Sequence, residues 1–244
     1  MIKLDAATVL LQWATGGLLF LWFTTRKHEM SAGYSWLIRA SFLVLAAGGA
    51  AAGIATDFLP IRDISAIAVA AVSLLTIRRK NVHLDLVAPA IGFIGLIAAA
   101  IHATDGASNI TVNLLRVLVG TVFLGAVSDA MLLGHWYLVQ PGLPRSILNE
   151  LVTALRWVLP VEVAVMLLPT GMFSVLSGAV DDGWNGTLGW FWVACAITTA
   201  VLIEVTRAAL RERSYSAVMA ATGLLYLAIL TAFGTDLVSR AILA

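Results

Sequence analysis

Charged residues are scarce in this sequence. Aspartate, glutamate, lysine and arginine together make up 12% of the 244 residues, whereas hydrophobic residues make up 60%. A soluble domain is typically about one quarter charged and about half apolar. The composition therefore excludes a soluble globular domain, a disordered segment and a nucleic-acid-binding protein. It indicates a helical protein that lies in a lipid bilayer.

Cysteine, net charge and catalytic motifs are also missing. The single cysteine, Cys195, excludes an internal disulfide and a metal site built from several cysteines. Fifteen basic residues against fourteen acidic ones give a net charge of +1, which indicates no strongly charged partner. The sequence has no phosphate-binding loop, no HExxH motif and no nucleophile motif. We therefore expect no metal site, and we assign any catalysis to partner subunits.

Long apolar runs make up most of the chain. A membrane-spanning helix needs about 20 mostly apolar residues. Short connections between such runs place consecutive helices side by side and antiparallel. The sequence therefore predicts an all-α, polytopic integral membrane protein in which residues 1–244 form a single domain, a bundle of eight transmembrane helices. The predicted spans are 7–24, 35–55, 61–77, 84–102, 113–138, 147–168, 187–206 and 216–238.

Basic residues are distributed unevenly between the two sides of this predicted bundle. Loops that stay in the cytoplasm carry an excess of lysine and arginine. Eleven of the fifteen basic residues lie in or beside the first, third, fifth and seventh loops, and four lie on the other side. We therefore expect both termini on the non-cytoplasmic side, in the cytoplasmic (inner) membrane of a prokaryote. The four exceptions are Lys3, Arg62, Arg116 and Arg240.

Small residues recur at helical spacing within several predicted spans. Examples are Gly49 with Gly53, and Gly120 with Gly125. Such pairs let two helix backbones approach closely in a membrane. They predict close helix packing inside this subunit, and a groove for a lipid or isoprenoid tail is the alternative.

Ionisable residues lie inside the fifth and sixth spans. Because a buried charge is costly in a membrane, we expect each of them to be paired with another polar group or to have a function. The turn between these spans centres near residue 142.5, so residues whose numbers sum to 285 lie at equal depth in an antiparallel hairpin. Asp129 and Arg156 sum to 285, and so do His135 and Glu150. The sums predict two pairs, which either lock the hairpin or form a proton path or head-group site.

Glu162 has no such partner at equal depth. Pro160, two residues earlier, cannot donate a hydrogen bond to the preceding turn, so the sixth span should kink there. An acid beside a broken helix is typical of ion and substrate sites in transporters. We predict that Glu162 lines an internal polar cavity. The alternative is that Arg116 or another helix end satisfies it.

Two further charged pairs have an ordinary explanation. Glu204 precedes Arg207 by three residues, and Asp236 precedes Arg240 by four. Both spacings are those of surface ion pairs on a helix.

Histidines could hold a haem group or a quinone. A b-type haem needs two histidines on neighbouring helices at similar depth. His83 and His135 meet this requirement to within about 4.5 Å along the helix axis. His102 lies at the opposite side without a second histidine, so the sequence allows at most one haem.

Three functions remain open from the sequence. The first is an integral-membrane subunit of a larger respiratory or energy-converting complex, with other membrane or peripheral subunits as partners, contributing a proton path or a quinone site in electron transport. The second is a self-contained transporter of small solutes or protons built on Asp129, Arg156 and Glu162. The third, an intramembrane enzyme acting on lipids, has the weakest support because its loops lack paired acids or histidines.

Overall fold

The computed structural model of the chain describes residues 5–27, 30–79, 82–103, 109–140 and 142–243. These residues form helices and short connections, and no strand occurs among them. The helices are α1 (Ala6–Thr25), α2 (Ala32–Ala55), α3 (Pro60–Thr76), η1 (Val82–Leu86), α4 (Val87–His102), α5 (Ile110–Val139), α6 (Arg145–Leu167), α7 (Gly171–Leu176), α8 (Thr187–Arg211) and α9 (Tyr215–Leu243).

A long helix occupies each of the eight apolar stretches, but they differ in character. Six helical segments in the described chain are long and apolar enough to cross a membrane, which indicates a membrane-integral protein. The other two are α3, which has 17 residues, and α6, which carries four charged residues in 23. The sequence did not predict the short α7, nor that the stretch 84–102 begins as the 3-10 helix η1. The six segments are Ala6–Thr25, Ala32–Ala55, Val82–His102, Ile110–Val139, Thr187–Arg211 and Tyr215–Leu243.

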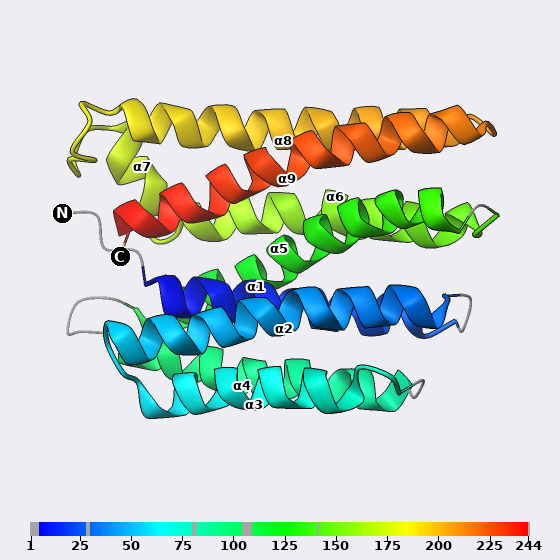
Figure 1. The fold of residues 1–244 in the computed structure, drawn as a ribbon. Coiled ribbons are helices and arrows are strands. Elements are labelled where there is room, and N and C mark those ends of the chain that lie inside the picture. The colour runs from blue at the N-terminus through cyan, green and yellow to red at the C-terminus, as the bar shows by residue number, and fades with distance from the viewer. Residues whose placement is uncertain (1–4, 28–29, 80–81, 104–108, 141, 244) are drawn as a thin grey trace.

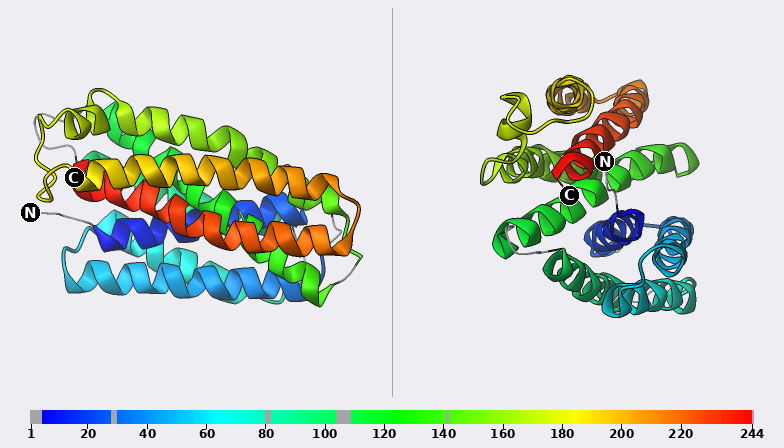
Figure 2. Two further views of the ribbon diagram at one scale, coloured as in Figure 1. Left: turned by 90° about the horizontal axis from the view of Figure 1, so that it is seen from above. Right: turned by 90° about the vertical axis from the view of Figure 1, so that its left-hand side faces the viewer.

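The long helices lie side by side in one bundle, and α5 crosses it obliquely (Figures 1 and 2). Helices α1–α4 pack on one side of α5, and α6, α8 and α9 pack on the other. Both chain ends lie at the same end of the bundle, which we call the terminal end. The turns after α1, α3, α5 and α8 lie at the opposite end (Figure 1), which we call the basic end because of its arginines.

A close backbone contact joins α1 to α5. A side-chain carbon added to Gly16 would overlap the backbone oxygen of Thr121, and one added to Gly125 would overlap the backbone of Gly16. Both positions must therefore be glycine for the two backbones to meet. Close packing inside the subunit, predicted from Gly120 and Gly125, is confirmed, although the sequence did not single out Gly16.

The start of α8 depends on a buried acid in the loop before it. Asp182 Oδ1 accepts hydrogen bonds from the backbone nitrogens of Trp184 (2.9 Å) and Gly186 (2.8 Å), and Oδ2 accepts one from Leu188 (2.8 Å). Burial opposes ionisation of this carboxyl group, but the backbone N–H groups outweigh burial and lower the pKa of Asp182. The carboxylate thus satisfies backbone donors that the first turn of a helix leaves free.

Candidate functional site

The predicted pair of Asp129 and Arg156 is not formed. Asp129 is fully buried on α5, and neither carboxyl oxygen has a hydrogen-bond partner among the described residues. Arg156 instead reaches α8, where its Nε lies 2.5 Å from Glu204 Oε1. The depth argument failed because equal depth does not fix direction around a helix. Leu155 lies in the packed core, and Arg156 is rotated from it by about 100°.

The predicted pair of His135 and Glu150 is also wrong. His135 Nδ1 lies 3.2 Å from the hydroxyl oxygen of Tyr226 on α9. Glu150 lies near the start of α6 and pairs with Arg26 (3.1 Å) and Lys27 at the end of α1. The two side chains leave the hairpin of α5 and α6 in different directions. Each therefore bonds a third helix instead of the other.

The two proposed haem ligands lie on different elements of the bundle. His83 belongs to η1, which packs on α1 and α4, whereas His135 faces Tyr226 of α9. A single b-type haem held by both histidines stays a prediction.

Glu162 lies in the interior of the bundle. Helix α6 continues through Pro160 as one helix to Leu167. The Glu162 side chain is fully buried, and neither of its oxygens has a hydrogen-bond partner among the described residues. Its charged neighbours are Asp236 and Arg240 of α9 and Arg116 of α5. The acid that the sequence singled out therefore faces a buried group of charges.

These charges form a connected cluster between α1, α5, α6 and α9. Arg240 Nε donates to both carboxyl oxygens of Asp236, each at 2.9 Å, and Arg240 Nη2 donates to the Arg116 carbonyl at 2.6 Å. With its amide oxygen turned toward Arg240, Gln12 accepts a further hydrogen bond at 2.9 Å. We call Gln12, Arg116, Glu162, Asp236 and Arg240 the Glu162 cluster.

Gly120 makes room for the Glu162 cluster. A side-chain carbon at this position would overlap Arg240 Nη2 and crowd the carboxyl group of Asp236. The small residue on α5 therefore admits a charged pair from α9, in addition to letting helices approach. The ion pair is fully buried at Asp236, and the Arg240 side chain is only 13% exposed.

Sequence reasoning missed Asp236 and Arg240, because it interpreted them as a surface pair. Asp236 follows the buried Ala228 and Ala232 at four-residue spacing and precedes the buried Ser239 by three. These small residues mark the packed face of α9. This periodicity was the signal in the sequence that could have placed Asp236 inside the bundle.

Other buried acids in the described chain have donors. Asp85 pairs with Arg39 and accepts a hydrogen bond from the Thr25 hydroxyl at 3.0 Å. Asp63 pairs with Arg62 at 2.7 Å and accepts a hydrogen bond from the backbone nitrogen of Leu59 at 2.8 Å. Within the described residues, the buried acid oxygens without a partner all belong to Asp129 and Glu162. These two carboxyl groups are therefore the strongest candidates for proton binding.

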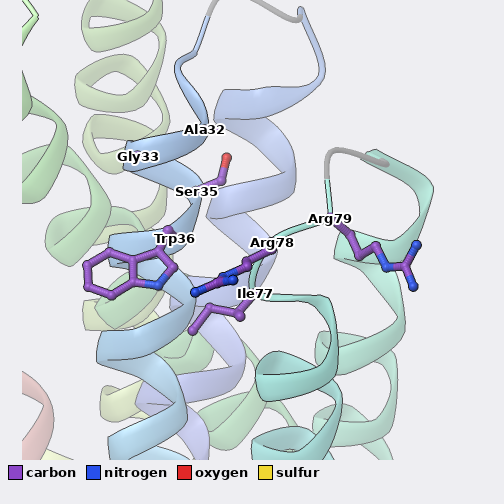
Figure 3. Close-up of a pocket in the computed structure, with 7 residues that line it drawn as sticks. All are labelled: Ala32, Gly33, Ser35, Trp36, Ile77, Arg78 and Arg79. Carbon is purple, nitrogen blue, oxygen red and sulfur yellow. The ribbon is translucent and has the colours of Figure 1, made fainter.

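Two hollows of about 240 Å³ open on the described surface, and neither is lined by Asp129 or Glu162. The first lies at the basic end, between the start of α2 and the end of α3 (Figure 3). The second is largely apolar and includes Ser128 of α5, whose hydroxyl oxygen accepts a hydrogen bond from Trp13 Nε1 at 2.7 Å.

Comparison of this chain with protein-family models, with curated proteins and with solved structures finds no match.

Proposed function

We propose that this chain is an eight-span integral-membrane subunit of a larger respiratory or energy-converting complex, to which it contributes a proton path. Helices α3 and α6 complete the eight spans in this proposal. Two observations support these spans: α3 and α6 lie alongside the six apolar segments, and both termini lie at one end of the bundle, which requires an even number of crossings. The surplus of arginine at the basic end supports a cytoplasmic location for that end.

The observation that carries the assignment to a complex is a partly exposed group of charges on the outside of α6 and α8. Glu204 pairs with Arg156 at 2.5 Å and with Arg207 at 2.8 Å, and the side chains of Arg156 and Glu204 are 42% and 52% exposed. Arg156 lies about 16 Å along α6 from its first residue, and Glu204 about 10 Å from the last residue of α8. Charges at such positions are costly against lipid. A partner subunit covering this face would remove that cost.

The proton path in this proposal runs through Asp129 and the Glu162 cluster. A protonated Glu162 can donate a hydrogen bond to Asp236, whose carboxyl group lies beside it. A deprotonated Glu162 can turn to Arg116, whose Nε is buried without a partner in the described structure. The cluster thus offers a neighbour for each protonation state, as a proton-binding group requires.

The second hollow is the place that we assign to a quinone ring. It is walled by aromatic and aliphatic side chains from α1, α2, α5 and α9, with the Ser128 hydroxyl as a polar group. Apolar walls with a few polar groups are typical of small-molecule sites. Ser128 immediately precedes Asp129 in α5, which puts the hollow next to the proposed path along the chain. The lining residues are Trp13, Ser41, Phe42, Leu45, Ser128, Met131, Leu132 and Ile229.

A self-contained transporter of small solutes or protons is the second candidate, and one feature favours it. Along α5, Asp129 lies about 6 Å from Gly125 on one side, and Gly120, which contacts the Glu162 cluster, lies about 7.5 Å from it on the other side. The tight contact of Gly16 with Gly125 therefore falls between the two acidic sites. Two sites separated by a closed contact suit a carrier that loads from either side. Arg156, which the sequence placed in the transporter site, is not part of this second candidate, because it faces α8.

Reporter fusions test the topology. We expect fusions after Arg79 and after Arg211 to report a cytoplasmic location, because both positions lie at the basic end. A fusion at Ala244 should report the opposite side. A cytoplasmic signal from the fusion at Ala244 would mean an odd number of crossings, and α3 or α6 would then lie outside the set of spans.

Gentle purification tests membership in a complex. We expect the wild-type chain to elute with other subunits, at a protein mass well above the 25.9 kDa of one chain. Replacing Arg156 and Glu204 together with leucine should release the partner while the chain remains folded, because this ion pair is partly exposed. The matched control is the double replacement of Arg26 and Glu150, an ion pair at the basic end. A wild-type chain that elutes alone and moves protons or solutes in vesicles would instead establish the transporter.

A further inference from the structure

We infer that the hollow at the basic end between α2 and α3 binds the phosphate head group of an anionic phospholipid. The first turn of α2 and the turn after α3 form its walls (Figure 3). Helix α2 begins and helix α3 ends beside the hollow. The hollow therefore opens at the depth of the lipid head groups in the proposed topology. The lining residues are Ala32, Gly33, Ser35, Trp36, Ile77, Arg78 and Arg79.

Positive charge at the hollow is not neutralised by the protein. The Arg78 side chain points across the hollow toward Trp36, whereas Arg79 points away from it (Figure 3). Neither arginine forms an ion pair with a described residue. A guanidinium group matches the geometry of a phosphate group and holds it through paired hydrogen bonds.

Backbone donors at the start of α2 add to this charge. Ser31 precedes the helix but makes no side-chain capping hydrogen bond, and its Oγ is buried without a partner in the described chain. The first N–H groups of a helix have no partner within the helix, and they attract anions. Ala32 and Gly33 of this first turn line the hollow together with Arg78, so both features favour the same anionic ligand.

The walls of the hollow are held in place by buried contacts. Arg39 of α2 forms a buried ion pair with Asp85 of η1, and its Nη1 donates to the Arg79 carbonyl at 3.1 Å. The Arg79 nitrogen also donates to the Thr76 carbonyl at 2.8 Å. The turn that carries Arg78 is therefore fixed against α2 before any ligand binds, which lowers the entropic cost of binding.

The surface beside the hollow suits a lipid better than a free anion. Trp36 is 50% exposed at the rim, and tryptophan is enriched at the membrane interface. On α3, Leu74 and Leu75 are 59% and 77% exposed and lead from the hollow along the helix. An acyl chain can follow this apolar surface while the head group stays beside Arg78. Basic pockets between helices on the cytoplasmic side are known to bind anionic head groups.

Lipid titration of the purified full-length chain tests the site. Short-chain phosphatidylglycerol, phosphatidylcholine of the same chain length and sodium phosphate would each be added in neutral detergent, and the unfolding temperature followed. A ligand that binds the folded state raises this temperature with concentration. We expect phosphatidylglycerol to act at clearly lower concentration than the other two. Arg78→Gln should raise the concentration needed about fivefold, since one arginine near a lipid surface contributes about 1 kcal/mol.

Arg211→Gln is the matched control, because it removes an exposed arginine at the same end of the bundle but outside the hollow. It should leave the response to phosphatidylglycerol unchanged. An equal loss in both variants would mean diffuse surface charge and would overturn the site. Equal responses to the two lipids would also overturn it, and an equal response to sodium phosphate would assign the hollow to a free anion.

Discussion

Replacing Arg39 with methionine should lower the free energy of unfolding by about 3–5 kcal/mol, because the change leaves the buried carboxylate of Asp85 without its cation. The side chains of Arg39 and Asp85 are each 3% exposed, so water cannot replace the lost partner. The substitution also removes the hydrogen bond to the Arg79 carbonyl, which holds the turn after α3. Equilibrium unfolding in mixed detergent micelles would measure the loss.

A double variant and a matched control test whether the unpaired buried charge causes this loss of stability. Arg39→Met combined with Asp85→Leu should recover most of the stability, because no unpaired charge remains inside the protein. Arg156→Met removes an arginine from a partly exposed pair, and we expect a smaller loss than for Arg39→Met, because Glu204 keeps Arg207 as its second partner. If the Arg39 and Arg156 variants proved equally stable, burial of the Arg39 pair would not contribute to the fold.

Glu162→Gln should abolish proton transfer by the proposed complex while leaving the fold and the assembly intact. A carboxylate without donors is costly in the membrane interior, so we expect the resting form of Glu162 to carry a proton. Glutamine keeps the shape of that form and can still donate to Asp236, but it cannot release a proton. Infrared spectroscopy should therefore show a weaker carbonyl band of protonated carboxylic acids in the variant.

Two comparisons separate Glu162 from other acids. Glu204→Gln is the matched control, because Glu204 is exposed and paired with two arginines, and it should leave the band unchanged. The intensity that remains in Glu162→Gln should disappear when Asp129→Asn is added, since Asp129 is the other buried acid without donors in the described residues. Full proton transfer by the Glu162→Gln complex would exclude this residue from the path.

The ranges of the long helices could be predicted because they follow from local composition. A run of about 20 apolar residues forms a helix in a membrane whatever its neighbours are. The short α7 could not be predicted in the same way. It has only six residues, Gly171–Leu176, which is too few for an apolar run to indicate a helix. The sequence also identified Glu162 and Asp129 as intramembrane acids, and both are buried.

The partners of the charged residues could not be predicted, because they depend on rotation about the helix axis and on helices distant in sequence. Arg156 and Glu150 belong to the same helix, yet the first pairs with α8 and the second with α1. Asp236 was predicted to lie at the surface for the same reason. Its position inside the bundle depends on Gly120 of α5, which faces it. Depth along a helix can be counted from the sequence, but direction requires the packed structure.

If α3 crosses the membrane as proposed, its short length has a consequence for the surrounding bilayer. Its 17 residues extend about 25 Å, whereas the hydrocarbon core of a typical bilayer is about 30 Å thick. The 30 residues of α5 extend about 45 Å and fit only because the helix is inclined across the bundle. In the proposed eight-span topology, the protein would meet its bilayer with a hydrophobic mismatch at α3. The bilayer beside α3 would then thin locally, and the stability of the bundle would depend on bilayer thickness.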